Sequence, residues 1–508
     1  MKPQRAPSVE SYTPARDSFE SLVLFLDSSP AQRMSQFEIE TQIDRRAMEI
    51  KRHLLQGHLD DRSMDDRARA DLDVMGTGLA VKSAKRAVES IFGRVSLTRF
   101  LVQRAGSKVL QFPLDRALNL QPELYSLAVQ KRVAEYARDV SIDKTVEWMS
   151  RTTGANVPKR QSEESVQRAA QDFVAFYDQR SVPANDSITD RKLLVMSVDA
   201  TGVSMIRRDL REATRLKAEA ELGAPRKHKD PMMPNKKHQR NHSKRMATVT
   251  AIYDQEAMVR TSEDILEQLS AVDQKTRRQM PRPLHKTVSA TLKKTQKSAI
   301  TTMMQAGERR DPEHRRTTLV LVDGASLQLA QIEAEAHRMG WTIIVIVDLI
   351  HVLSYLWKAA KSLSKTAVEK PSVGELVDSF VKLLLEGKVK QLATLIERRA
   401  KAQKLSESRD DVVARCVRYL RNNAEHLKYD EYLAAGYPIA TGVIEGACRH
   451  LVKDRMAITG ARWGIKTAEA ILRLRALQIN GDWDEYWTFH QSRCAARLTA
   501  KYQTDIMS

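Results

Sequence analysis

The chain has 508 residues, of which 42% are hydrophobic, so it is long enough to form about two to four domains with real cores. Its 83 Lys and Arg exceed its 64 Asp and Glu, and the net charge of +19 favours a polyanionic partner over the alternative of a merely basic protein. The 3 cysteines form no Cys-x-x-Cys pair, which excludes a disulfide framework and a cysteine zinc site. No apolar stretch approaches the roughly 20 residues that span a bilayer, so we expect a cytoplasmic protein.

The first part of the chain, residues 1–84, is predicted to be a helical region and a candidate for oligomerisation. Apolar residues recur at helical spacing over 15–58, whereas the charged stretch 60–73 has the composition of a linker. Period-two alternation then predicts a β-hairpin over 91–114, with its turn at Ala105, Gly106 and Ser107.

Residues 85–190 are predicted to add a helix-turn-helix to this hairpin and to bind DNA. Helical patterns cover 122–140 and 141–154, with Ser141 as an N-cap, and Pro158 is placed to begin a further helix over 157–177. Two helices joined by a glycine-containing turn can place the second helix in the major groove, although an ordinary helical hairpin is the alternative. The second helix would present three cations to DNA, namely Lys159, Arg160 and Arg168.

Alternating strands and helices begin near residue 190, and residues 191–370 are predicted to be the first part of an α/β core. The helix between the last two strands covers 326–339, a hairpin turn is expected at 253–257, and the predicted strands are 193–199, 246–253, 257–261, 318–323 and 342–348. Three strands in a meander, followed by strand, helix and strand, is the order of an RNase H-like fold with a mixed five-stranded sheet. That fold carries metal-binding acids at the ends of its first and fourth strands.

A basic insertion, residues 207–245, separates the first two predicted strands. It holds 13 Lys and Arg against 5 Asp and Glu, and its second half has almost no apolar residues. We interpret it as a phosphate-binding loop, with a solvated loop as the alternative. The candidate DNA contacts are Arg226, Lys227, Lys229, Lys236, Lys237, Arg240, Lys244 and Arg245.

A second insertion, residues 371–438, consists of amphipathic helical patterns and is predicted to be all helical. It interrupts the core, which we expect to resume over 439–508 with the helix that carries Glu445 and with the C-terminal helices.

Three acidic residues stand where a metal-dependent phosphoryl-transfer site needs them. Asp199 and Asp323 end two apolar strands, and Glu445 opens a helix far along the chain. Carboxylates suit hard cations, and a pair of Mg²⁺ ions, with Mn²⁺ as a substitute, can activate water and stabilise a leaving 3′ oxygen. Each Asp alone has the bland alternative of a turn or helix cap, so the prediction depends on the set of three.

Two long strings resemble a known family: RRDPEHRRTTLVLVDGASLQLAQIEAEAHRMGWTIIVIVDLIHVLSYLWKAA (309–360) and YPIATGVIEGACRHLVKDRMAITGARWGIKTAEAILRLRALQINGDWDEYW (437–487). They are similar to the core of bacterial insertion-sequence transposases of the DDE type, specifically the Kra-type insertion-sequence family, a relative of the Mutator-like transposases. The resemblance covers about residues 85–490, and its two long motifs are highly specific. It implies that Asp199 in SVDATG, Asp323 in LVDGAS and Glu445 in GVIEGA form a catalytic triad.

The resemblance also implies a supporting set around the triad. Asp348 and His351 match a C/D-x-x-H signature in VDLIH, and Trp463 in TGARW is expected to stack on an unpaired base. A capping Asp, a core His and a core Trp are the bland alternatives. Cations near Glu445 are expected to contact the scissile phosphates: Arg449, His450, Lys453, Arg455 and Arg462.

We therefore expect a nucleoid-associated transposase that binds the terminal inverted repeats of an insertion sequence and cleaves and transfers DNA strands. Its partners would be double-stranded DNA, both transposon ends and target, and at least a second copy of the chain during synapsis. Two alternatives remain, an RNase H-like nuclease or resolvase without strand transfer and a catalytically inactive DNA-binding regulator.

Overall fold

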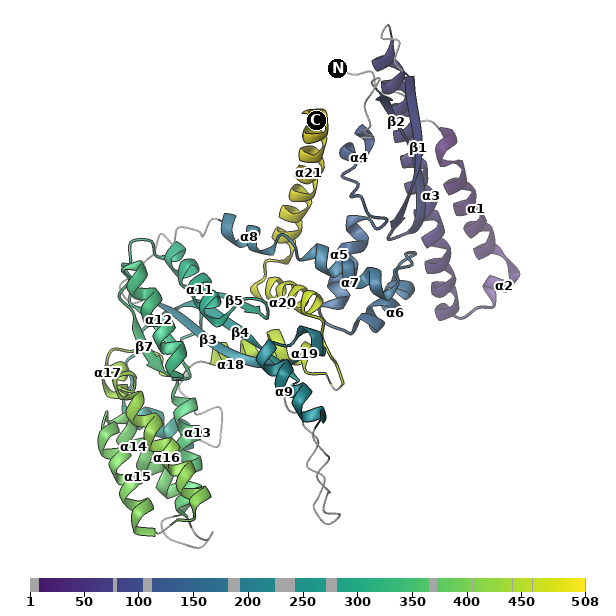
Figure 1. The fold of residues 1–508 in the computed structure, drawn as a ribbon. Coiled ribbons are helices and arrows are strands. Elements are labelled where there is room, and N and C mark those ends of the chain that lie inside the picture. Colours follow the sequence, from purple (N-terminus) through teal and green to yellow (C-terminus); the bar gives the residue numbers. More distant parts are fainter. Residues whose placement is uncertain are drawn as a thin grey trace. The chain divides into compact units, whose positions relative to one another are not determined.

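A computed structural model describes residues 9–75, 80–103, 112–180, 192–223, 243–270, 281–364, 372–403, 405–440, 442–458 and 460–507. The chain divides into two compact units, one made of residues 1–179 and 473–508 and the other of residues 180–472 (Figure 1). Helix α20 (Ile465–Asn480) spans the division. The expected core segment 439–508 is thus split, because residues from Arg473 onward pack with the N-terminal part of the chain.

In the first unit, a long helix packs against a β-hairpin. A short 3₁₀ turn (Val9–Tyr12) precedes α1 (Thr13–Asp27), α2 (Ser29–Gln32), α3 (Gln36–Val74), β1 (Ala80–Ser90) and β2 (Gly93–Gln103). The prediction of a linker over 60–73 is wrong, because this stretch is the second half of α3. Its charges form i,i+4 ion pairs along the helix, and Asp66 accepts the backbone N–H of Phe100 in β2 at 2.7 Å.

The structure contains a hairpin, but not the one expected over 91–114, because only its second strand, β2, lies in that range and α4 begins at Pro113. β1 and β2 are antiparallel from Ala80↔Gln103 to Ser90↔Gly93, so the chain reverses at Ile91 and Phe92. The predicted turn at 105–107 lies outside the described residues. The expected boundary between 84 and 85 therefore falls inside β1.

Five short helices and one long one complete this unit. The short helices are α4 (Pro113–Ala117), α5 (Leu127–Ala137), α6 (Ile142–Thr152), α7 (Lys159–Ala169) and α8 (Phe173–Gln179), and the long one is the C-terminal helix α21 (Trp483–Met507). Ser141 caps α6 as predicted, accepting the N–H of Lys144 at 3.2 Å. The helix expected over 157–177 is two helices, and α5, α6 and α7 pack on one another. The hydroxyl of Tyr486 in α21 donates to the carbonyl of Ala169 at the end of α7, which joins the C-terminal helix to this unit.

The second unit is built on a mixed five-stranded sheet, as expected, and its strand order is β5-β4-β3-β6-β7. Its strands are β3 (Lys192–Ser204), β4 (Lys244–Glu256), β5 (Leu284–Thr291), β6 (Thr318–Val322) and β7 (Ile344–Val347). β4 is antiparallel to β3 and β5, whereas β6 is parallel to β3 and β7. Buried Val, Ile, Leu and Met residues fill β3, β6 and β7, as strands covered on both faces require.

The third strand was predicted wrongly. β4 continues to Glu256, where a turn was expected over 253–257, and residues 257–261 form no strand. Their backbone is satisfied elsewhere, since the N–H of Met258 bonds to Gly436 and that of Arg260 to Leu433. The third strand is β5, which follows α10 (Ser262–Ser270).

Helices α11 (Gln296–Arg310), α12 (Ser326–Met339) and α13 (Leu349–Leu363) share one hydrophobic core with the sheet. α12 matches the predicted range, and it ends at Gly340 in the left-handed conformation. The region between β3 and β4 holds a 3₁₀ turn (Arg207–Asp209) and α9 (Glu212–Gly223).

The second insertion is helical throughout its described residues. It contains α14 (Val373–Leu385), α15 (Val389–Gln403), α16 (Glu407–Asn422), a 3₁₀ turn (Ala424–His426) and α17 (Tyr429–Ala434). These helices pack on α13 and α10 and continue the core of the sheet. After the insertion the chain forms α18 (Gly442–Ala447), a π-helical turn (Cys448–Lys453) and α19 (Asp454–Met456). Across the described parts of the chain, no helix combines the length and the apolar character that a membrane span requires.

Candidate active site

Sheet register brings three acids to one level. Ser197 of β3 pairs with Leu321 of β6, so two residues further on Asp199 is level with Asp323. Val322 of β6 pairs with Val347 of β7, so the next residues, Asp323 and Asp348, are also level. Since β3, β6 and β7 are parallel, the three acids gather at the carboxyl edge of this part of the sheet.

Asp199 was expected at the end of its strand, and the structure differs. β3 continues to Ser204, but beyond Ser197 its only neighbouring strand in the sheet is β4. Asp199 therefore lies within a strand that extends past its neighbour β6, and the ladder to Val249 of β4 holds its backbone on one side.

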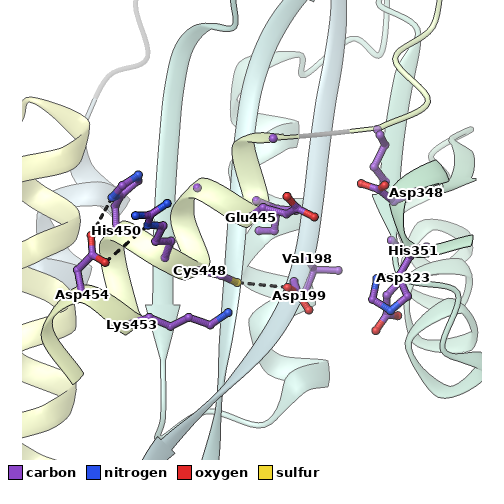
Figure 2. Close-up of a pocket in the computed structure, with 16 residues that line it drawn as sticks. Val198, Asp199, Asp323, Asp348, His351, Glu445, Cys448, His450, Lys453 and Asp454 are labelled. Carbon is purple, nitrogen blue, oxygen red and sulfur yellow. Dashed lines mark hydrogen bonds and ion pairs between the residues drawn. The ribbon is translucent and has the colours of Figure 1, made fainter. Parts of the chain in front are cut away.

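Glu445 reaches the same place from α18, which packs against β3 and β4. A cavity of about 710 Å³ is lined by all four acids, Asp199, Asp323, Asp348 and Glu445, and by His351 from the first turn of α13 (Figure 2). The structure thus brings together the three acids predicted as metal ligands and two of the three supporting residues.

Each aspartate is oriented by its local backbone. Asp199 Oδ1 accepts the N–H of Ala200 at 2.6 Å, and Asp323 Oδ1 accepts the N–H of Ala325 at 2.9 Å. Asp348 is the N-cap of α13 and accepts the N–H of Ile350 at 2.7 Å. A local turn or cap role is therefore correct for Asp323 and Asp348, whereas Asp199 lies within a strand, and all three also line one cavity.

Cys448 contacts this site and was not predicted. Its Sγ–H donates to Asp199 Oδ2 at 3.3 Å, and burial together with the charge of Asp199 raises the pKa of the thiol well above its usual range. The thiol therefore stays protonated and acts as a donor rather than a nucleophile. Its position three residues after Glu445 on a helix was the signal that could have identified it.

Three of the basic residues expected after Glu445 line the cavity, namely Arg449, His450 and Lys453. Asp454, which was not predicted, lies 2.8 Å from His450 Nδ1 and 3.9 Å from Arg449 Nε. Lys453 extends along the cavity toward Asp199 (Figure 2). A π-helical turn holds these residues, and such turns recur at functional sites.

Two other residues expected in this region are inside the protein. Arg455 is only 2% exposed, and its guanidinium lies 4.7 Å from the ring centroid of Trp463. Trp463 is 8% exposed, donates from Nε1 to the carbonyl of Met456, and does not line the cavity. Its backbone pairs with Ser204 at the end of β3, so in this structure it is a packing residue, whereas Arg462 is exposed.

Magnesium fits this cavity by donor type, since the acids offer the oxygen ligands that hard cations prefer. Among the described residues, however, no three His, Cys, Asp or Glu side chains converge closely enough to hold a metal ion. The acids face a shared space rather than forming a closed coordination shell.

The remaining predicted DNA contacts are placed as follows. In α7 the three cations are paired, Lys159 with Asp143 at 2.7 Å, Arg160 with Glu164 at 3.1 Å and Arg168 with Glu123 at 3.2 Å. In β4, Lys244 is exposed, whereas Arg245 donates to the carbonyls of Leu292 and Asp209 and therefore supports the fold. Six candidates lie outside the described residues, namely Arg226, Lys227, Lys229, Lys236, Lys237 and Arg240.

Comparisons with known proteins add no family to this description. No protein-family model matches the chain, and no curated protein matches it.

Proposed function

We propose that this protein is a DDE transposase, which binds the terminal inverted repeats of an insertion sequence and catalyses metal-dependent DNA strand cleavage and strand transfer. The observation that carries the proposal is the convergence of Asp199, Asp323 and Glu445, from three distant segments, on one cavity that exposed cations also line. The net charge of +19 supports a nucleic-acid substrate.

We propose further that the second unit is an RNase H-like core. The five strands follow the order expected for that fold, with a meander of β3, β4 and β5 and then the parallel strands β6 and β7 around α12. The two aspartates are associated with the first and fourth strands, which is where that fold carries its metal ligands.

Asp199, Asp323 and Glu445 would hold Mg²⁺, with Asp348 and His351 beside them. Bound Mg²⁺ supplies an activated nucleophile and stabilises charge on the leaving oxygen. The residues of the chain do the rest. Ala200 and Cys448 orient the Asp199 carboxylate, and Arg449 and Lys453 provide positive charge for the scissile phosphate.

DNA recognition is assigned to other segments. The helix pair α6 and α7 would read the terminal repeats, and the basic segment between β3 and β4 would contact phosphates. The ion pairs of α7 with Asp143, Glu164 and Glu123 would have to exchange for phosphate contacts on binding. Synapsis of two ends requires at least two copies of the chain.

The direct test is metal-dependent cleavage of DNA that carries the element's ends. Asp199→Asn, Asp323→Asn and Glu445→Gln should each reduce cleavage to background and leave binding to end DNA nearly intact. The matched control is Asp410→Asn, which makes the same chemical change at an exposed position in the first turn of α16. Cleavage that survives in all three variants would exclude this site as the catalytic centre.

A second assay separates transposition from simple cleavage. Pre-cut DNA with free 3′-OH ends should be joined to target DNA by the wild-type protein. Cleavage without joining would identify a nuclease or resolvase instead. DNA binding with neither activity would identify an inactive regulator, an outcome consistent with the open arrangement of the acids.

A further inference from the structure

The second insertion, residues 371–438, is called the helical insertion below. It contacts the ends of the two strands that precede Asp323 and Asp348. Tyr419 of α16 donates its hydroxyl to the backbone carbonyl of Asp323 at 2.8 Å. Tyr429 of α17 donates its hydroxyl to the carbonyl of Val347 at 2.7 Å, one residue before Asp348. At the ends of both β6 and β7, a tyrosine hydroxyl of the insertion therefore donates a hydrogen bond to a backbone carbonyl.

The turn after β6 is shaped to receive α16. Gly324 has φ +79°, and a Cβ at this position would lie 2.8 Å from the Tyr419 hydroxyl and 3.1 Å from Asn423 Oδ1. Asn423 is 2% exposed, its Nδ2 donates to the carbonyl of Tyr419, and its Oδ1 has no hydrogen-bond partner among the described residues. Glycine is therefore the residue that lets the insertion approach the Asp323 backbone this closely.

Both tyrosines are held in place by packing. The ring of Tyr419 stacks on Tyr355 of α13 with centroids 4.1 Å apart and an interplanar angle of 11°. Tyr429 is fully buried.

The Tyr419 hydrogen bond holds a peptide that lies beyond the sheet ladder, whereas the Tyr429 hydrogen bond holds the last residue of β7. The β6–β7 ladder ends at Val322↔Val347, so the backbone carbonyl of Asp323 lies beyond its last pair. A hydrogen bond from a packed helix restricts the rotation of that peptide and thereby the direction of the Asp323 side chain.

We propose that the helical insertion is a positioning element of the active site, in which Tyr419 and Tyr429 hold Asp323 and Asp348 in their working orientation. The catalytic part of this inference rests on the proposed function, whereas the structural part does not. Tyr419 and Tyr429 are positioning residues, since they act through the strand ends and line no part of the cavity.

Hydrogen–deuterium exchange tests the structural part without any activity. The amide of Ala325 donates to Asp323 Oδ1 and so reports the orientation of that carboxylate. Tyr419→Phe, which keeps the ring, should accelerate exchange at this amide by about threefold to tenfold, as expected for loss of one hydrogen bond. Tyr432→Phe is the control, because it removes a hydroxyl from a buried residue of the same insertion, and the described hydrogen bonds of β6 and β7 do not involve it. Equal exchange in both variants would overturn the proposal.

Kinetics test the catalytic part. Tyr419→Phe should lower kcat for Mg²⁺-dependent cleavage about tenfold or less and raise the Mg²⁺ concentration needed for half-maximal rate, with little change in KM for DNA. Tyr429→Phe should act in the same direction, and Tyr432→Phe should do neither. An unchanged kcat and Mg²⁺ requirement in an active protein would refute the positioning role. A protein in which exchange responds to Tyr419→Phe but the wild type cuts no DNA would instead refute the proposed function.

Discussion

Replacement of Gly324 by alanine tests how tightly the turn after β6 is matched to the helical insertion. The left-handed conformation costs a residue with a Cβ about 1–2 kcal/mol. At Gly324 the new Cβ would also stand 2.8 Å from the Tyr419 hydroxyl, which must then move away from the carbonyl of Asp323. The broken hydrogen bond and its unsatisfied partners add about 1–3 kcal/mol of destabilisation.

Gly340 provides a matched control at the other end of α12. Its φ is +64°, and a Cβ there would meet no atom within 4 Å. Gly340→Ala therefore carries the conformational cost without the steric one, and any entropic stabilisation from replacing a glycine applies equally to both variants. We expect Gly324→Ala to lower the free energy of unfolding by about 1–3 kcal/mol more than Gly340→Ala.

Urea unfolding followed by circular dichroism measures this difference, with equal m-values as the condition for comparing the two variants. Both glycines belong to the same compact unit, so they report on the same transition. The double variant Gly324→Ala with Tyr419→Phe sharpens the test, because phenylalanine lacks the hydroxyl that is the nearest obstacle. Its destabilisation should be smaller than the sum of the two single effects. Additive effects, or equal destabilisation by Gly324→Ala and Gly340→Ala, would refute the reasoning.

Two further predictions concern other parts of the chain. The buried ring of His490 donates from Nδ1 to Asp172 at 2.6 Å. Burial alone would lower the pKa of His490, but its hydrogen bonds to Asp172 and Cys494 outweigh burial and raise it. Burial alone would raise the pKa of Asp172, but its hydrogen bonds to His490 and Arg497 outweigh burial and lower it. A histidine whose pKa is raised on folding stabilises the folded state at pH values below its pKa in the unfolded chain, and this stabilisation is lost as pH rises through its pKa in the folded protein. Asp172→Asn should therefore destabilise the protein more at about pH 6 than at about pH 9. A difference in unfolding free energy that does not change with pH would contradict this prediction. The second prediction concerns the basic segment, in which four cations are neutralised. The slope of the logarithm of the DNA-binding constant against the logarithm of salt concentration should become less steep, by about 0.9 for each phosphate that the variant no longer neutralises. An unchanged slope would show that the segment does not bind phosphate. The four cations are Lys227, Lys236, Lys237 and Arg240.

Local sequence patterns predicted much of the secondary structure. Periodicity and composition predicted β6, β7 and the first part of β3, the helix over Ser326–Met339 and the helical nature of the second insertion. Ser141 is a correct N-cap because capping involves a hydrogen bond between residues three positions apart. The prediction of a linker over 60–73 failed because composition does not reveal that Asp66 and its neighbours bond to a hairpin.

The third strand illustrates a different limit. Residues 257–261 are apolar enough to form a strand, but their N–H groups bond to Leu433 and Gly436. That competition comes from a segment far along the chain, so no local pattern could reveal it. The same is true of Trp463 and Arg455, whose packing against each other decides that neither is exposed.

The order of amino acids was enough to locate the acidic and basic residues and most of the strands, and to indicate Asp199, Asp323 and Glu445 as a set. Their arrangement around one cavity required the folded chain, because it depends on the parallel register of β3, β6 and β7 and on the packing of α18. The hydrogen bond from Tyr419 of a separate insertion to the backbone of Asp323 also required the folded chain. Register and packing are long-range properties, set by many burial and hydrogen-bonding interactions at once, whereas patterns in the sequence report interactions within a few residues.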